Sequence, residues 1–295
     1  MLKASQTLEA AVDVVRVEST RQATMPEIIT VTSGKGGVGK TNLAVNLGVL
    51  LRQRKQRVLM MDADLHLGKL DIILGASPQY TLADLVDGSR TIEEIIMSHP
   101  SGIDVLPATS GELNLLDADQ RIMKVMAESF SRIQNNYDYI IVDTAAGIST
   151  TVLTMALGAD KVILVITPEP ASISDVYAMV KVISHKSPEL PLILVPNRVK
   201  SLDDGLELHK KLNLITQKFL HTNLHYGGSV VEDGAVRQAI VRQRPFVLEF
   251  PKSQATYNLQ LVCHRMLKLQ PTQFSKRSNI FDRLRVKRKV VATLS

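Results

Sequence analysis

Residues 33–41 read Ser-Gly-Lys-Gly-Gly-Val-Gly-Lys-Thr, and no other segment constrains the fold of this chain as strongly. The glycines, the second lysine and the threonine match the spacing G-x-x-x-x-G-K-[ST] of a phosphate-binding P-loop. The β-branched run at 28–32 predicts a buried strand before the loop, and the segment at 42–51 predicts a helix after it. A strand, a glycine-rich turn and a helix in this order indicate a P-loop rather than an incidental glycine-rich turn.

The residue types of this loop suit the phosphates of a nucleotide. Glycine lacks a Cβ, so backbone N–H groups can approach phosphate oxygens closely, and the positive end of the following helix adds to the attraction. Lys40 is expected to reach the β- and γ-phosphates, and the Thr41 hydroxyl is an expected ligand of Mg²⁺. The residues that we expect to contact the nucleotide here are Gly34, Lys35, Gly36, Gly37, Val38, Gly39, Lys40, Thr41 and Asn42.

Two further apolar runs lead into aspartates. The run at 57–61 precedes Asp62 and Asp64, and the run at 139–142 precedes Asp143. Because the carboxyl ends of parallel strands lie at one edge of a sheet, these carboxylates should face the phosphates. We expect Asp62 and Asp143 to belong to the Mg²⁺ site and Asp64 to orient the water that attacks the γ-phosphate, with Lys40 as the phosphate-binding catalytic lysine. Helix capping is the alternative role for the first two aspartates.

The rest of the chain alternates apolar strands with helices. Strands are predicted at 103–107, 161–166, 191–196 and 224–231, and helices at 81–88, 112–134, 174–185, 202–220, 234–243 and 253–268. Strands that are apolar throughout belong to a mostly parallel sheet with helices on both faces, so the fold class is α/β with a single domain, expected over 26–270. Residues 1–25 form either a short amphipathic arm or a frayed tail.

Composition excludes several classes of protein. Cys263 is the one cysteine, which excludes a disulfide framework and cysteine-ligated metal clusters within one chain. No run of about 18 apolar residues is present, as a membrane span would need, and the N-terminus has no apolar core of a secretory signal. We therefore expect a cytoplasmic protein. A net charge of +6 fits an anionic partner without choosing among nucleotide, membrane surface and DNA.

The C-terminal segment over 271–295 differs in character from the domain. After a polar linker, residues 279–289 read Asn-Ile-Phe-Asp-Arg-Leu-Arg-Val-Lys-Arg-Lys. In a helix, Ile280, Phe281 and Leu284 would share one face between basic residues, which is typical of a short helix that binds a membrane surface. Dimerisation would bring two such tails together and raise their avidity. A disordered basic tail and a DNA-contacting tail are the alternatives.

The segment Lys-Gly-Gly-Val-Gly-Lys-Thr at 35–41 resembles the deviant Walker A motif of the MinD/ParA superfamily of dimerising ATPases. In that superfamily the first lysine reaches across a face-to-face dimer to the partner's ATP, a role that the resemblance gives to Lys35. It also implies that Glu169 lies near the partner's nucleotide and that Asn197 hydrogen-bonds adenine, with Arg198 beside it. An asparagine in a turn is the alternative for Asn197.

Three segments resemble the FlhG/FleN family in particular, the MinD-like ATPases that control flagellar number and placement. They are Asp-Thr-Ala-Ala-Gly-Ile from 143 onward, the segment 168–178, and Val-Arg-Gln-Ala at 236–239 ahead of Arg-Pro at 244–245. The resemblance covers about residues 26–270. It implies ATP and ADP with Mg²⁺, homodimerisation on ATP binding, and a slow ATPase that acts as a switch, with loops at 62–71 and 143–147 that respond to the γ-phosphate.

The same resemblance implies three partners. These are an FlhF-like SRP GTPase, a flagellar transcription activator of the AAA+ type, and the anionic surface at the inner face of the cell membrane. Direct contact with nucleic acid is not expected. Ser5-Gln6-Thr7 keeps only the glutamine of the Asp-Gln-Ala motif with which many FlhG proteins stimulate the GTPase. This favours the branch that antagonises a transcription activator. A ParA-type DNA-segregation ATPase and a division-site MinD remain the alternatives.

Overall fold

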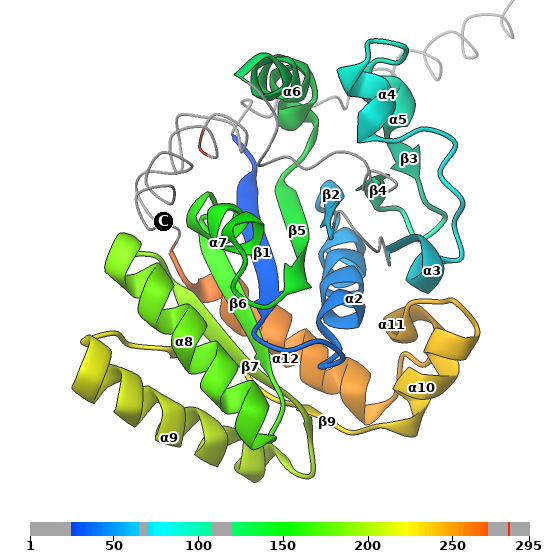
Figure 1. Cartoon of the computed structure of the whole chain (residues 1–295). Coiled ribbons are helices and arrows are strands. Elements are labelled where there is room, and N and C mark those ends of the chain that lie inside the picture. Colours follow the sequence, from blue (N-terminus) through cyan, green and yellow to red (C-terminus); the bar gives the residue numbers. More distant parts are fainter. Residues whose placement is uncertain (1–24, 65–69, 108–119, 271–282, 284–295) are drawn as a thin grey trace, which may run out of the picture.

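The computed structural model describes residues 25–64, 70–107, 120–270 and Arg283. This part of the chain folds around one sheet (Figure 1), in which all paired strands are parallel except β3 and β4. The order across the sheet is β3 (Met97–Ser98), β4 (Asp104–Leu106), β2 (Val58–Ala63), β5 (Tyr139–Ala146), β1 (Glu27–Ser33), β6 (Lys161–Ile166), β7 (Leu192–Val199) and β8 (His225–Tyr226), and β9 (Val230–Val231) also pairs with β7. The predicted α/β class with a mostly parallel sheet is confirmed.

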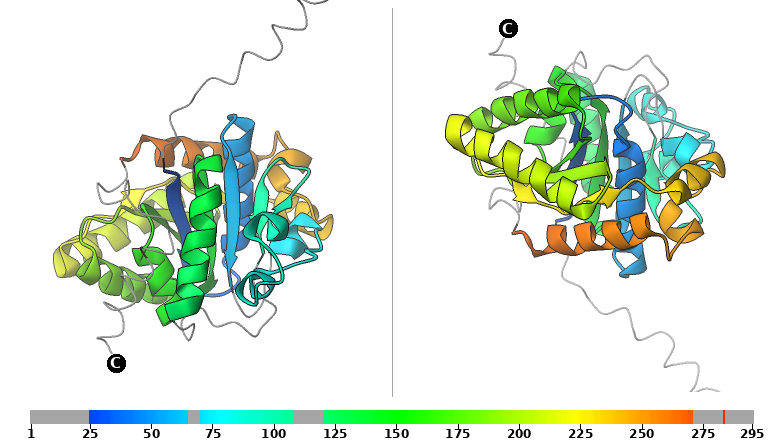
Figure 2. Two further views of the ribbon diagram at one scale, coloured as in Figure 1. Left: turned by 90° about the horizontal axis from the view of Figure 1, so that it is seen from above. Right: turned by 90° about the horizontal axis from the view of Figure 1, so that it is seen from below.

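Helices cover both faces of the sheet (Figure 2). One face carries α2 (Lys40–Gln53), α3 (Leu70–Leu74), α10 (Gly234–Val241), α11 (Phe246–Glu249) and α12 (Gln254–Lys268). The other carries α4 (Leu82–Val86), α5 (Ile92–Ile95), α6 (Gln120–Ile133) with the 3-10 turn η1 (Gln134–Asn136), α7 (Thr150–Leu157), α8 (Pro170–Lys186) and α9 (Leu202–Leu220).

The two helix layers explain why the central strands are apolar throughout. Along β5, Ile140 and Val142 pack into the core on the α6–α9 side, whereas Ile141 packs against the α2–α12 side. All three side chains are fully buried. A strand that has a core on each face needs an apolar residue at every position, which is the pattern that the sequence shows.

The predicted single strand at 224–231 is wrong. The structure has two short strands, β8 and β9, which pair with different parts of β7. Between them Gly228 adopts φ +109°, and a Cβ at Gly227 would lie 2.7 Å from Ile193 Cγ2. The glycine pair therefore ends one strand and redirects the chain, because a side-chain-bearing residue tolerates neither the left-handed backbone nor the close approach.

Several other elements differ from their predicted bounds. The helix at 174–185 begins at Pro170, since proline is well suited to the first turn of a helix, and β7 continues through Asn197 to Val199. The helices α7 and α11 were not predicted, because each is short and lies next to polar loop residues. Of the helix predicted at 112–134, residues 112–119 lie outside the described part.

Arg283 is the residue of the C-terminal segment that the structure describes. Its Nη1 donates to Asp160 Oδ1 at 2.7 Å, while Asp160 Oδ2 accepts from the backbone N–H of Ile28 at 2.8 Å. The predicted membrane-facing residues Ile280, Phe281 and Leu284 lie outside the described residues, as do residues 1–24. Among the helices that are described, none combines the length and apolar character needed to span a bilayer.

Candidate nucleotide-binding site

The P-loop lies at the middle of the carboxyl edge of the sheet, between β1 and α2 (Figure 1). The strand β1 pairs with β5 on one side and with β6 on the other, so the loop is flanked by the ends of both. Gly37 and Gly39 adopt φ +79° and +88°, a backbone conformation that favours glycine. The sequence therefore specifies a turn that only glycines form readily, directly at the start of a helix.

Gly34 is required for another reason, which is its close packing against α8. A Cβ at this position would lie 2.6 Å from the backbone carbon of Asp175 and 2.8 Å from the backbone nitrogen of Val176. Neither backbone atom can move without displacing the helix. At Gly36, in contrast, a Cβ would meet no atom closer than Ala146 Cβ at 4.0 Å.

We predict that Gly34→Ala lowers the free energy of unfolding by about 3 kcal/mol, as overpacking of a rigid site does. Gly36→Ala is the matched control and should change the free energy by less than about 0.5 kcal/mol, because its Cβ has room. Urea denaturation followed by circular dichroism measures both. Equal stability of the two variants would contradict the packing argument.

Lys40 and Asp143 form a buried ion pair at the base of the loop. Lys40 Nζ lies 2.6 Å from Asp143 Oδ1, and the two side chains are 8% and 1% exposed. Burial raises the pKa of Asp143, and the neighbouring Lys40 ammonium opposes this shift. Lys40 Nζ also lies 3.4 Å from Thr41 Oγ1. The lysine and threonine expected to bind phosphate and metal are thus held beside the aspartate.

Asp62 and Asp143 lie side by side on neighbouring strands. They are direct partners in the register of β2 and β5, so both side chains project from the same face of the sheet at its carboxyl edge, the edge predicted from the ends of the strands. Asp62 Oδ1 also accepts a hydrogen bond from the backbone N–H of Asp64 at 3.0 Å. Asp64 is 8% exposed, and its charge acts on Asp143. The three aspartates therefore form one cluster next to Lys40.

These donors fit Mg²⁺. The Thr41 hydroxyl and the carboxylates of Asp62 and Asp143 are hard oxygen ligands, and Mg²⁺ is usually held by one or two carboxylates together with phosphate oxygens and waters. The described residues contain no group of three or more His, Cys, Asp or Glu side chains arranged to hold a metal by themselves. A bound nucleotide would supply further oxygen ligands from its phosphates.

Lys35 lies at the outer side of the same loop. Its Nζ lies 2.6 Å from Glu169 Oε2, and the two side chains are 42% and 51% exposed. The hydrogen bond from Lys35 lowers the pKa of Glu169. The loop thus presents one lysine inward, to the aspartate cluster, and another outward, to an exposed carboxylate that precedes α8.

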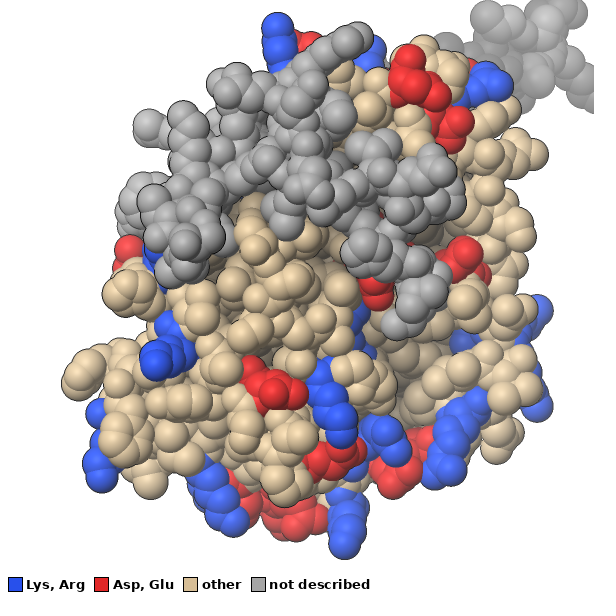
Figure 3. All heavy atoms as spheres, in the orientation of Figure 1, with Lys and Arg blue, Asp and Glu red and all other residues tan. Residues whose placement is uncertain are grey.

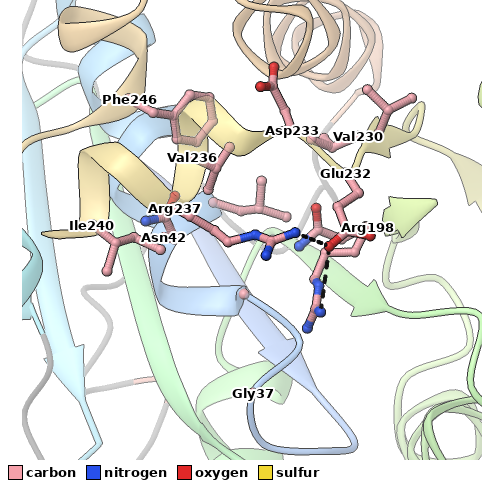
Figure 4. A pocket seen from close by; sticks show the side chains of 14 residues that line it. Gly37, Asn42, Arg198, Val230, Glu232, Asp233, Val236, Arg237, Ile240 and Phe246 are labelled. Atoms are coloured by element: carbon pink, nitrogen blue, oxygen red, sulfur yellow. Dashed lines mark hydrogen bonds and ion pairs between the residues drawn. The ribbon is translucent and has the colours of Figure 1, made fainter. Parts of the chain in front are cut away.

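A cavity of about 320 Å³ adjoins the other side of the P-loop (Figure 4). Asn42, Asn197 and Arg198 line it, as do Val236 and Phe246 from α10 and α11. It therefore brings together three residues that the sequence predicted at the nucleotide and two apolar side chains that can cover a flat aromatic ring.

Three charged residues of this cavity, Glu232, Asp233 and Arg237, were missed by the sequence analysis. Glu232 Oε1 pairs with Arg237 at 2.8 Å and lies 4.0 Å from Arg198 (Figure 4). In the sequence, the Val-Arg-Gln-Ala segment at 236–239 indicates only a family resemblance. A basic residue one turn into a predicted helix, close to an acidic residue before that helix, was the signal available for this pair.

Asn197 lies between the P-loop and the cavity. Its Nδ2 donates to the backbone carbonyl of Val38 at 2.7 Å. A Cβ at Gly39 would lie 2.6 Å from the same Nδ2, so the loop closes tightly over the amide. Because the amide nitrogen is bound to the loop, the oxygen of Asn197 remains as an acceptor. The structure places Asn197 in β7 rather than in a turn.

Three comparisons with known proteins give consistent results. A family model described as an AAA domain matches residues 26–190, a range that includes the P-loop, the aspartates and Glu169. The chain is 36% identical over 240 residues to the antiactivator FleN of Pseudomonas aeruginosa, covering 81% of this chain and 86% of that protein. It is 32% identical over 221 residues to the flagellum site-determining protein YlxH of Helicobacter pylori, covering 74% of each. The solved structure of the cell division ATPase MinD of Pyrococcus furiosus matches with a TM-score of 0.67 at 25% identity, over 83% of this chain and 100% of that one.

Proposed function

The chain belongs to the FlhG/FleN family of MinD/ParA-type P-loop ATPases, and from this premise we propose that it is an ATP-driven dimeric switch that controls flagellar number and placement. ATP and Mg²⁺ bind at the P-loop, two copies close over their nucleotides, and slow hydrolysis separates them again. The position of Lys35, exposed on a loop whose other lysine is buried, is the observation that carries the switch.

ATP binding exchanges the partners of Lys40. In the structure its ammonium lies against Asp143, and a buried charge of either residue is costly without a partner. The β- and γ-phosphates would take over Lys40, and Asp143, Asp62 and the Thr41 hydroxyl would then hold Mg²⁺. When bound, Mg²⁺ would neutralise part of the negative charge of the phosphates. Asp64, one residue beyond β2, positions the attacking water.

Dimerisation exchanges the partner of Lys35. Its ion pair with Glu169 is exposed to water, and such pairs contribute little stability, so a phosphate of a second copy's ATP can replace the carboxylate. Glu169 then lies close to the partner's nucleotide. Closure orders the loops at 62–71 and 143–147, and loss of the γ-phosphate reopens the dimer; residues 65–69 of the first loop lie outside the described part. Because slow ATP hydrolysis is coupled to assembly and separation of the dimer, the protein acts as a switch rather than as a metabolic enzyme.

The base preference follows from the orientation of Asn197. An amide whose nitrogen is bound to the Val38 carbonyl leaves its oxygen to accept a hydrogen bond from the exocyclic amine of adenine bound in the cavity. Guanine would present a carbonyl oxygen there and leave two acceptors facing each other. Val236 and Phe246 provide apolar contacts to the ring, and Arg198 lies at the outer rim.

The flagellar part of the proposal rests on the two relatives. One is named an antiactivator and the other a flagellum site-determining protein. We assign this chain a corresponding role in which it antagonises a flagellar transcription activator and acts with an FlhF-like GTPase. In this proposal the domain at 26–270 is the ATPase and residues 1–25 are an arm. The segment 271–295 binds an anionic membrane when two copies are joined. The protein is then cytoplasmic and associates peripherally with the inner face of the cell membrane.

Flagellar counts test the biological role. In the source organism, deletion of the gene is expected to raise the number of flagella per cell, counted by electron microscopy, and the intact chain should restore it while Lys40→Ala should not. An unchanged count with chromosome or plasmid loss would indicate a ParA-type segregation ATPase instead. Minicells would indicate a division-site MinD. Sedimentation with anionic liposomes or with DNA, in ATP and in ADP, tests the ParA-type alternative biochemically. A ParA-type ATPase would sediment with DNA in ATP, and this binding would weaken steeply with salt.

A further inference from the structure

A second cavity, of about 700 Å³, lies away from the P-loop and has no role in the function proposed above. Its walls are the end of α3, the turn after β3, the connection between α10 and α11, and α11 itself. In Figure 1 these elements lie on the right of the molecule, with α3 above α11. We refer to this cavity as the α3–α11 groove.

The walls of the groove are tied together. His99 Nε2, in the turn after β3, donates to the Leu74 carbonyl at the end of α3 at 2.9 Å. Gly75, which follows Leu74 at the end of α3, packs closely on Gln243. A Cβ at Gly75 would lie 3.3 Å from the Gln243 carbonyl oxygen. Gly75 and Gln243 both have positive φ, at 61° and 51°. The groove is therefore built by specific contacts and is not a gap between unconnected loops.

The groove combines apolar rims with a positive charge. Ile72, Val241 and Leu248, on the helices that flank it, are 58%, 84% and 43% exposed. Arg242 and Arg244 line it with side chains 55% and 71% exposed, and both pair with Glu249, which is 17% exposed and is the acidic residue among the lining side chains. Two arginines against one carboxylate leave an excess positive charge. Figure 3 shows lysine and arginine side chains over α10 and α11, at the lower right of the view.

The groove also connects to the nucleotide site from two directions. On one side, α11 places Phe246 in the cavity next to the P-loop, and the Val247 N–H donates to Asn46 Oδ1 at 3.0 Å. Asn46 is fully buried and in turn donates to the backbone carbonyl of Asn42 at 2.8 Å. On the other side, the first residue of α3, Leu70, donates from its N–H to Asp62 Oδ2 at 3.4 Å. Both hydrogen-bond connections therefore link a wall of the groove to a residue of the nucleotide site.

We propose that the α3–α11 groove binds an extended peptide segment of a partner protein, one that carries carboxylates beside large apolar side chains. The concave shape admits a chain rather than a flat lipid surface, the exposed Leu248 and its neighbours receive the apolar side chains, and Arg244 receives a carboxylate. Affinity differs between the ATP and ADP states because α11 and α3 both touch the nucleotide site. This coupling, unlike the docking itself, rests on the proposed nucleotide binding.

Peptide display on the full chain tests the docking. A random 12-residue library is selected on protein saturated with a non-hydrolysable ATP analogue and Mg²⁺ and counter-selected on Arg244→Glu. We expect enriched peptides to combine Asp or Glu with Leu, Ile or Phe. Synthetic fluorescent copies should bind Arg244→Glu and Leu248→Ser at least about tenfold more weakly by anisotropy. Both variants should keep the thermal midpoint and basal ATPase rate, since neither side chain lines the cavity next to the P-loop.

Matched controls come from the same chain. Lys252→Glu reverses an exposed charge just beyond α11, and Leu202→Ser removes an apolar side chain that is 40% exposed, close to the 43% of Leu248. Each should change peptide affinity less than about twofold. Enriched peptides without carboxylates, or peptides that bind both groove variants as tightly as the unaltered chain, would overturn the proposal. The proposal would also be overturned if inorganic phosphate binds in the groove instead of peptides, and if Arg244→Glu but not Leu248→Ser weakens this phosphate binding. That result would indicate an anion-binding site.

The coupling has its own readout. Peptide affinity should differ at least about threefold between samples that contain ATP analogue and ADP, with nucleotide binding measured by calorimetry on the same samples. Equal affinities in protein that binds both nucleotides would overturn the coupling. Protein that binds peptide but no nucleotide would instead refute the proposed function and leave the docking supported.

Discussion

Replacement of Lys35 by alanine is expected to abolish ATP-dependent dimerisation, weakening the dimer by at least about 100-fold. The Lys35 side chain is exposed, is held by Glu169 at 2.6 Å, and has no contact with the buried Lys40 cluster in the structure. Loss of a surface lysine should leave folding and ATP binding to the single chain nearly unchanged. The expected loss is therefore confined to the step in which two copies join. Light scattering with a non-hydrolysable ATP analogue and Mg²⁺ measures it.

Two further variants make the result specific. Lys210→Ala removes a lysine that is 59% exposed and pairs with Glu207, so it controls for the loss of a surface ion pair, and it should dimerise normally. Glu169→Gln removes the carboxylate that holds Lys35 and should retain dimerisation, because the lysine remains. An intact dimer in Lys35→Ala would refute the proposed role. An unaltered chain that stays monomeric with the ATP analogue would refute the switch itself.

Substitution of Asp64 by alanine should lower the ATPase turnover by at least about 100-fold, the lower end of what a positioned acid–base residue contributes. Asp64 follows β2 directly, is 8% exposed, and acts electrostatically on Asp143, so it lies at the carboxyl end of the strand beside the proposed metal site. ATP affinity should be retained and the dimer should accumulate, because the step that is lost is hydrolysis. Phosphate release and light scattering, measured on one sample, separate the two effects.

Asp62→Asn provides the contrast for this experiment. Its carboxylate lies beside Asp143 in the register of the sheet and accepts the Asp64 N–H, so its loss should raise the Mg²⁺ concentration needed for activity. Asp64→Ala should leave that concentration unchanged. Two results would contradict the proposal that Asp64 positions the water and Asp62 helps to hold the metal. They are normal turnover in Asp64→Ala, and an equal rise in the Mg²⁺ requirement in both variants.

Much of the site was predictable because its signals are local. The spacing of the P-loop glycines, Lys40 and Thr41 is a property of nine consecutive residues, and glycine is required where the backbone has φ +79° and +88°. Likewise, Asp62 and Asp143 follow strands whose apolar runs are continuous, and the edge at which parallel strands end is a general rule. The structure brings these residues together as that rule predicts.

Other features were not predictable because they depend on contacts between distant segments. The partners Lys40 and Asp143 are 103 residues apart, and Lys35 and Glu169 are 134 apart. Nothing local to Lys35 specifies that its ammonium is held by a carboxylate at the start of α8. The break between β8 and β9 has the same origin, since a Cβ at Gly227 is excluded by Ile193 of another strand.

From the sequence alone one obtains the α/β class, the phosphate loop and the aspartates that follow two strands, because hydrophobic period, glycine spacing and the polarity of parallel strands are short-range properties. Only the tertiary structure decides that Asn197 turns its amide nitrogen to the Val38 carbonyl, and that α11 lines both the cavity next to the P-loop and the α3–α11 groove and is bonded to Asn46. Those arrangements arise when side chains from separate elements are packed against each other and every buried polar group must find a partner.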